Sequence, residues 1–208
     1  MDVQKSATLV AERIAETPIR GRRRLVAVAG APGSGKSTLA HVVAARVPNA
    51  AVMPMDGFHL DDRLLRPAGL LPRKGAPETF DFGGFRACLA RVAEEDEVIL
   101  PVFDRTREIA IAGAERIGPE TETVIVEGNY LCLAQDPWSA LSDLWDLTVY
   151  LSVPMEELER RLIERWVSYE YDHAGAREKA MGNDIPNAHR VAEQLGPVDL
   201  TIDWEGHP

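Results

Sequence analysis

The chain has 208 residues, of which 45% are hydrophobic and 27% are charged, values that are ordinary for one globular domain. Its formal net charge of -10 argues against nucleic-acid binding, which normally needs a dense face of Lys and Arg. No apolar run reaches membrane-spanning length, and the N-terminal residues resemble neither a signal nor a transit peptide. We therefore expect a cytosolic protein that is not inserted in a membrane.

The first elements are a helix and a strand. Apolar residues at helical spacing predict a helix within residues 1–17, ending before Pro18. Residues 25–29 form a continuous apolar run, which predicts a central parallel strand covered on both faces. The one basic cluster precedes this strand, and we interpret it as a solvated surface rather than as a nucleic-acid site. It consists of Arg20, Arg22, Arg23 and Arg24.

A glycine-rich loop follows the strand and fits the Walker A pattern GxxxxGK[ST] in full. Its glycines let backbone N–H groups turn toward phosphates, and the helix that follows presents its positive end to them. We expect Lys36 to reach the β- and γ-phosphates and the Ser37 hydroxyl to bind Mg²⁺. The alternative is a chance glycine-rich turn. The residues expected to bind nucleotide are Gly30, Ala31, Pro32, Gly33, Ser34, Gly35, Lys36, Ser37 and Thr38.

The nucleotide is expected to be ATP, because the chain lacks the Asn-Lys-x-Asp segment typical of guanine sites. The predicted cofactors are therefore ATP and Mg²⁺. Cys88 and Cys132 have no metal-binding or redox spacing, and we interpret both as small buried or half-buried side chains.

The rest of the chain alternates between strand and helix patterns. The predicted elements are a helix at 38–47, a strand at 50–55, an irregular loop at 66–80, a helix at 80–94, a strand at 98–103, a short hairpin within 109–117, a strand at 123–126, a short helix at 138–144, a strand at 147–153, helices at 154–169, 174–181 and 187–195, and a strand at 198–202.

This alternation predicts an α/β fold of three layers, a mainly parallel sheet with helices on both faces, as in P-loop NTPases. We expect one kinase domain over residues 1–208, with an N-terminal helix at 1–17, a substrate-side loop at 66–80 and a helical lid at 154–182. Ligands of such sheets bind beyond the carboxyl ends of the strands. Asp56, Asp104 and Glu127 each follow a predicted strand, so we expect them to meet the glycine-rich loop at one edge.

Asp56 is the candidate for the group that accepts or orients the proton of an acceptor hydroxyl. Gly57 frees the backbone beside it, and Phe58 and His59 are expected to contact the acceptor. The alternative is that Asp56 caps a turn.

Glu127 is expected to hold the metal-bound water or the attacking group, with a turn cap as the alternative. Asp104 either orients the substrate or pairs with Arg105 or Arg107, and the sequence leaves this open. Arg105 itself is a further candidate for the substrate side.

Arginines of the helix at 154–169 are candidates for stabilising the charge of a transferring phosphoryl group. Arg161 and Arg165 are four residues apart and share a helix face with each other. The alternative is a solvated face in which these arginines and Arg160 pair with nearby glutamates. In the loop at 66–80, Arg73 and Lys74 are expected to close over the substrate.

Several segments, in this order, resemble those of the superfamily of phosphoribulokinase, uridine kinase and bacterial pantothenate kinase. The chain is most similar to short bacterial kinases associated with fructose transport systems. The segments that carry the resemblance are Gly30 to Ser37, Met55-Asp56-Gly57-Phe58-His59, Arg73-Lys74-Gly75-Ala76-Pro77-Glu78-Thr79-Phe80-Asp81, Val102-Phe103-Asp104-Arg105 and Val126-Glu127-Gly128-Asn129-Tyr130.

The resemblance implies an ATP-dependent kinase that phosphorylates an alcohol group of a small molecule. It implies that Asp56 is the catalytic acid beside the acceptor, that Glu127 is the acid of a second strand, and that Arg161 and Arg165 are the arginines of a lid helix. Fructose is the favoured acceptor on overall likeness, and a homodimer is suggested on the same basis.

Two alternatives for the acceptor are pantothenate and a nucleoside such as uridine. Uridine kinases usually carry Asp-Ser-Phe-Tyr where this chain has Asp-Gly-Phe-His at 56–59, and pantothenate kinases are considerably longer. Alternatives of other classes are an ATPase or nucleotide switch without a small acceptor, and an inactive binding module. A switch requires neither the arginine-bearing helix at 154–169 nor the Phe-His segment at 58–59. An inactive module would often have lost a key polar residue, but this chain keeps Lys36, Ser37, Asp56 and Glu127.

Overall fold

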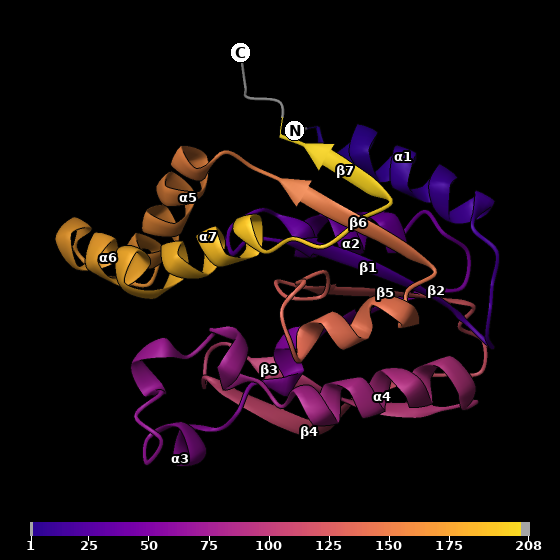
Figure 1. The fold of residues 1–208 in the computed structure, drawn as a ribbon, viewed down its shortest axis with the longest axis horizontal. Coiled ribbons are helices and arrows are strands. Elements are labelled where there is room, and N and C mark those ends of the chain that lie inside the picture. The colour runs from indigo at the N-terminus through magenta and orange to yellow at the C-terminus, as the bar shows by residue number, and fades with distance from the viewer. Residues whose placement is uncertain (1, 205–208) are drawn as a thin grey trace.

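The computed structural model describes residues 2–204, in which a five-stranded sheet with strand order β2-β5-β1-β6-β7 forms the centre (Figure 1). All four pairings in this sheet are parallel. A separate antiparallel pair is formed by β3 and β4. The strands are β1 (Arg24–Gly30), β2 (Ala50–Pro54), β3 (Val98–Asp104), β4 (Ile109–Ile117), β5 (Thr123–Gly128), β6 (Leu147–Ser152) and β7 (Leu200–Asp203).

Helices lie on both faces of the central sheet, as the sequence predicts. The α-helices are α1 (Val3–Glu16), α2 (Lys36–Ala44), α3 (Asp62–Leu65), α4 (Phe82–Glu94), α5 (Met155–Ser168), α6 (His173–Lys179) and α7 (Ile185–Glu193). Short 3₁₀ helices are η1 (Met55–Phe58), η2 (Leu71–Arg73), η3 (Pro77–Thr79) and η4 (Trp138–Leu144), and η5 (Ala180–Asp184) is a π-helical turn.

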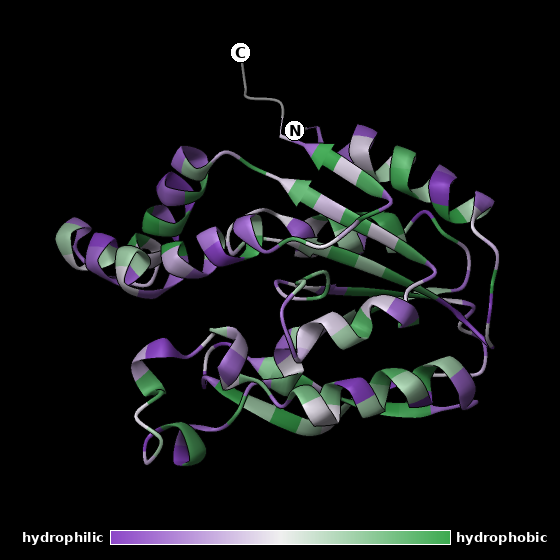
Figure 2. Cartoon of the chain, viewed as in Figure 1, coloured by the Kyte–Doolittle hydropathy of each residue, from purple (hydrophilic) through white to green (hydrophobic). Residues whose placement is uncertain are grey.

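The residues of β1 divide the core into two halves. Val26 and Val28 pack with buried residues of α1 and α2 on one face of the sheet. Leu25, Ala27 and Ala29 pack on the other face, against the core that α4, η4 and the hairpin share. This alternation is the period of two expected of a strand, and burial on both faces explains why the run is wholly apolar. Figure 2 shows hydrophobic residues concentrated on the strands of the central sheet.

The hairpin departs from the predicted sheet. Residues 98–103 were expected to join the parallel sheet, and 109–117 to form a hairpin alone, but β3 pairs in antiparallel fashion with β4. The burial of β3 gives the physical reason: Val98 and Leu100 are buried, whereas Ile99 between them is 47% exposed. A strand with one solvent-exposed face suits a two-stranded antiparallel ribbon packed on the core, rather than a central position in a sheet that helices cover on both faces.

The C-terminal helices also differ from the prediction. Separate helices were expected at 174–181 and 187–195, but α6 runs into α7 through the π-helical turn η5. The N–H of Ile185 donates to the carbonyl of Ala180, which is the wider spacing of a π turn. Pro186 lies in the first turn of α7 and has no N–H with which to continue the α-helical pattern. We call residues 155–193, from α5 to α7, the lid segment; its closure over a ligand stays a prediction.

The basic cluster before β1 is only in part the solvated surface that we predicted. Arg23 is 1% exposed, and its guanidinium donates to five backbone carbonyls. These carbonyls belong to the end of α4 and the turn after it, and to the loop that precedes β5. Arg20 and Arg22 do lie at the surface, where they pair with Asp146 and Asp96. The five acceptors are the carbonyls of Val92, Glu95, Asp96, Gly118 and Thr121.

No helix of residues 2–204 is long and apolar enough to cross a bilayer. Cys88 is buried and Cys132 half-buried, both as free thiols. Burial raises the pKa of the Cys88 thiol and raises the pKa of the Cys132 thiol to about 12, which makes both poor nucleophiles.

Arg23 is expected to be a major contributor to stability. Arg23→Met should lower the free energy of unfolding by about 2–4 kcal/mol, because buried carbonyls lose their charged donor. Arg22→Met is the matched control and should change it by less than about 1 kcal/mol, since its ion pair is solvated. Urea denaturation of the wild type and of both variants measures these free energies of unfolding. Equal effects of the two substitutions would contradict a special role for Arg23.

Candidate active site

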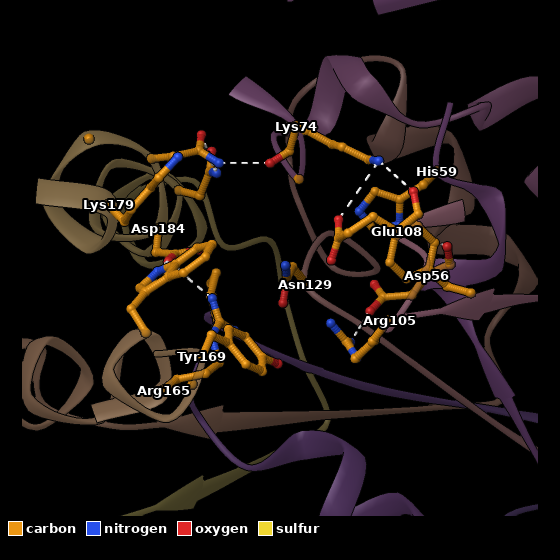
Figure 3. A pocket seen from close by; sticks show the side chains of 18 of the residues that line it. Asp56, His59, Lys74, Arg105, Glu108, Asn129, Arg165, Tyr169, Lys179 and Asp184 are labelled. Atoms are coloured by element: carbon orange, nitrogen blue, oxygen red, sulfur yellow. Dashed lines mark hydrogen bonds and ion pairs between the residues drawn. The ribbon is translucent and has the colours of Figure 1, made fainter. Parts of the chain in front are cut away.

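A cleft of about 800 Å³ opens at the carboxyl edge of the central sheet. The glycine-rich loop and the first turn of α2 form its floor, and the lid segment forms one wall. The opposite wall combines η1, the loop around η2 and the turn between β3 and β4 (Figure 3). Segments that are far apart in the sequence therefore share one cavity, as the predicted parallel sheet requires.

The glycine-rich loop has the backbone that its sequence predicts. Gly33 and Gly35 have φ angles of 79° and 95°, in the left-handed region that favours glycine. A Cβ atom at Gly30 would lie 2.6 Å from the Ser34 Oγ, so that position also needs glycine. Lys36, Ser37 and Thr38 begin α2 and line the cleft, whereas Gly30, Ala31 and Ser34 shape the loop from behind.

Lys36 and Glu127 are electrostatically coupled at the floor of the cleft. Burial lowers the pKa of Lys36, and the nearby carboxylates of Glu127 and Asp56 oppose that shift. Burial likewise raises the pKa of Glu127, opposed mainly by Lys36 and by a hydrogen bond from the Ser37 hydroxyl. Each charge thus compensates part of the desolvation of the other.

Strand order brings Asp56 beside these two residues. In the register of the sheet, Glu127 of β5 lies opposite Pro54 of β2, two residues before Asp56. Asp56 sits in η1, half-buried, and its Oδ2 accepts a hydrogen bond from an Nη2 of Arg105. Close packing holds this geometry, because a Cβ atom at Gly57 would lie 2.3 Å from the Pro101 carbonyl oxygen of β3.

Aromatic rings form the wall next to Asp56. The ring of His59 lies between those of Phe80 and Phe103, with centroids 4.1 Å and 4.5 Å away. Its Nδ1 lies 2.8 Å from the Asp56 carbonyl oxygen. Burial lowers the pKa of His59, so the imidazole is neutral at pH 7 and its Nδ1–H donates to that carbonyl.

Lys74 lies on the same wall and is already paired. Its Nζ donates to the Asp62 Oδ1 at 2.8 Å and to the Glu108 carbonyl at 2.7 Å. The Glu108 carboxylate is 3.8 Å away. The lysine therefore ties the loop at 66–80 to α3 and to the turn of the hairpin. Figure 3 shows its contact with Glu108 in that turn.

Three predicted substrate residues do not line the cleft. Phe58 is buried and packs edge-to-face on Phe85 of the core, at 5.1 Å between centroids. Arg73 pairs with Glu78 of its own loop. Asp104 was placed at the edge of the parallel sheet, which is wrong because β3 belongs to the hairpin. Its carboxylate accepts hydrogen bonds from Thr106 and Arg107, and these hold its pKa well below the usual range.

The two arginines of α5 have different surroundings despite their shared spacing. Arg165 lines the cleft, and its Nη2 lies 3.0 Å from Asp184. Arg161 does not line it; an Nη1 of Arg161 instead donates to the carbonyls of Gly33 and Ser34, at 3.2 Å and 3.3 Å. Arg161 thus braces the phosphate loop from outside. The alternative interpretation, pairing with nearby glutamates, holds for Arg160, which pairs with Glu157 and Glu164, and in part for Arg161, whose Nε pairs with Glu157.

Sequence reasoning missed several residues that line the cleft. Asn129 follows Glu127-Gly128 directly, and its buried Oδ1 has no partner among the described residues. Its position directly after the end of β5 is the sequence feature that could have predicted it as a cleft residue. Trp166, Tyr169 and Tyr171 form an edge-to-face cluster near the end of α5. No periodicity marks these aromatic residues, because Trp166 lies in the last turn of α5 and Tyr169 and Tyr171 follow its end, so their meeting depends on the path of the chain in space.

The comparisons with known proteins agree on a family. A crystal structure described as a "putative fructose transport system kinase" from Silicibacter sp. TM1040 is 48% identical, covers 97% of this chain and 99% of its own, and has a TM-score of 0.89. The "Putative uridine kinase C227.14" of Schizosaccharomyces pombe is 33% identical over 87% of this chain and 83% of its own length.

The chain belongs to the uridine kinase, pantothenate kinase and phosphoribulokinase family of P-loop kinases. It is a small-molecule kinase by this membership. A pantothenate kinase of Rhodococcus erythropolis is 31% identical over 69% of this chain, and the match covers 48% of that protein. No protein-family model matches the chain.

The contact between η1 and β3 gives a prediction for this kinase. Gly57→Ala should lower the free energy of unfolding by about 1–3 kcal/mol, because the new methyl group overlaps the Pro101 carbonyl. It should also reduce turnover, since Asp56 and Arg105 lie on the two segments that are pushed apart. Gly83→Ala is the control: this exposed position in α4 has room for a Cβ atom, and alanine there should add about 0.5–1 kcal/mol. Denaturation curves and turnover rates measure both; unchanged stability of Gly57→Ala would contradict the tight contact.

Proposed function

We propose that this kinase transfers the γ-phosphoryl group of Mg-ATP to a hydroxyl of a small neutral polyol, with a sugar such as fructose as the first candidate. The observation that carries the proposal is that Lys36 and Asp56 open on one cleft, at the ends of strands that β5 holds side by side. Lys36 is suited to the phosphates of the donor, and Asp56 is suited to the hydroxyl of the acceptor.

On the donor side, the backbone of the glycine-rich loop and the N-terminus of α2 supply N–H groups for the phosphates. Lys36 adds a cation, and Arg165 faces the same space from the lid segment. Phosphoryl transfer depends mainly on positioning and on stabilising negative charge, and these are the properties that such a set of residues offers.

Mg²⁺ fits this site as an ion shared with the nucleotide. Among residues 2–204 no group of three or more His, Cys, Asp or Glu is arranged to hold a metal. Mg²⁺ prefers few protein ligands together with substrate phosphates and water, so a closed protein cage is not required. The Ser37 hydroxyl and the Glu127 carboxylate are hydrogen-bonded neighbours and would hold it. When bound, it would neutralise charge on the phosphates.

On the acceptor side, the charges favour a neutral molecule. Arg105 is paired with Asp56, and Lys74 is paired with Asp62 and lies near Glu108. His59 is neutral, as its lowered pKa requires. A carboxylate or phosphate on the acceptor would have to displace one of these partners, whereas polyol hydroxyls can share their hydrogen bonds. This balance disfavours pantothenate, and the similarity to the fructose transport system kinase supports a sugar.

The test is an assay of ADP release with Mg-ATP and a panel of D-fructose, other hexoses, pentoses, pantothenate and uridine. We expect a neutral sugar to stimulate turnover. Stimulation by pantothenate alone or uridine alone would replace the sugar by that acceptor. Slow hydrolysis that no acceptor accelerates would instead favour a nucleotide switch.

Asp56→Asn tests the role of the carboxylate. The variant should lose about 10²- to 10⁴-fold in acceptor-dependent kcat, because the amide cannot accept the hydroxyl proton. Its affinity for Mg-ATP, measured by titration calorimetry, should change little. Asp61→Asn, which changes a half-buried carboxylate that caps α3 and does not line the cleft, is the control and should keep the wild-type rate. A fully active Asp56→Asn would overturn the assignment.

A further inference from the structure

Asp184 is a buried carboxylate that the resemblance to known kinases leaves without a role. It is 9% exposed and ends the π-helical turn η5. Its Oδ2 accepts a hydrogen bond from the indole Nε1 of Trp166 at 2.6 Å and lies 3.0 Å from an Nη2 of Arg165. One oxygen atom therefore contacts two consecutive residues of α5, across the lid segment (Figure 3).

The ordinary explanation for an acid at this position is a helix cap, and the contacts exclude it. Asp184 immediately precedes α7, but its side chain makes no capping hydrogen bond to the first turn of that helix. Its backbone is helical rather than extended, unlike that of most N-cap residues. The carboxylate points away from α7 and toward α5.

Arg165 lines the cleft with its guanidinium held at one nitrogen, since its Nη2 lies 3.0 Å from the Asp184 carboxylate. Its Nε is buried and does not open on the cleft, so the terminal N–H groups are the ones available to a ligand. Arg165 lines the same cleft as Lys36 and is close enough to lower the pKa of that lysine. A guanidinium has five N–H donors, and a phosphate oxygen is the kind of acceptor that those left over from the pair with Asp184 would bind at the cleft.

We propose that Asp184 is the positioning residue of Arg165: it fixes the guanidinium by one end so that the other donors face the terminal phosphate of the nucleotide. The side chain of an arginine has several freely rotating bonds, so a fixed anchor reduces the entropy lost when the phosphate binds. The π turn is what brings the carboxylate here, because it shifts the helix by the wider spacing between Ala180 and Ile185. The proposal rests on the proposed function only in taking ATP as the donor.

The test compares the affinities of Mg-AMP-PNP and Mg-ADP by titration calorimetry, so that no acceptor is needed. The wild type should prefer the triphosphate analogue, because Arg165 contacts its terminal phosphate. Asp184→Ala and Arg165→Ala should each reduce this preference by about tenfold, as expected for one charge-assisted hydrogen bond. The double variant should lose no more than either single variant, since both remove the same interaction.

A control separates positioning from general damage to the lid segment. Glu159→Gln breaks a comparable ion pair outside the cleft, that of Glu159 in α5 with Arg177 in α6, and should keep the preference. Should Asp184→Ala fail to fold, Asp184→Asn replaces it, with a smaller loss because a neutral amide oxygen is a weaker acceptor.

Losses that multiply in the double variant would overturn the proposal, and so would a wild-type preference that survives in Asp184→Ala and Asp184→Asn. A wild type with no preference for the triphosphate analogue would overturn it as well. A sugar panel that gives no stimulation leaves this binding test unaffected, so failure of the proposed function and failure of this inference are distinguishable.

Discussion

β5 is paired in parallel with β2 on one side and with β1 on the other, and the register sets Glu127 beside both Pro54 and Val28. Because parallel strands end at the same edge, the glycine-rich loop after β1, the carboxylate at the end of β5 and Asp56 after β2 must be neighbours. The wholly apolar faces of β1 and β5 in turn require cover on both sides of the sheet, which α1 and α2 on one face and the α4 side on the other provide.

The cleft is built from pairs of opposite charge, and each pair joins two different elements. Arg105 of the hairpin turn meets Asp56 of η1, Lys74 of the loop meets Asp62 of α3, and Arg165 of α5 meets Asp184 of η5. Long cationic side chains are thereby held in place on the walls of the cleft. Such pairs compensate the cost of partial burial and also connect the walls of the cleft mechanically.

Arg161 and Arg165 show how little spacing alone says about role. Both lie on one face of α5, and sequence reasoning treated them alike. One helical turn is about 5.4 Å, however, and over that distance the surroundings change from the back of the phosphate loop to the open cleft. Arg161 donates to loop carbonyls, whereas Arg165 pairs with Asp184 and lines the cleft. Asp104 and Phe58 likewise lie next to cleft residues in sequence while their side chains turn elsewhere.

The sequence by itself determined the parts that depend on local chemistry: the glycine-rich loop, whose φ angles need glycine; the apolar central strands; and the carboxylates that end β2 and β5. These follow from neighbours along the chain, and the strand–loop–helix context limits their geometry. Only the tertiary structure decided that β3 leaves the parallel sheet, that Arg23 is buried under five carbonyls, and that Asp184 reaches Arg165. Each of these joins segments distant in sequence, and their partners are selected by packing and by the need to satisfy buried polar groups, which no local pattern records.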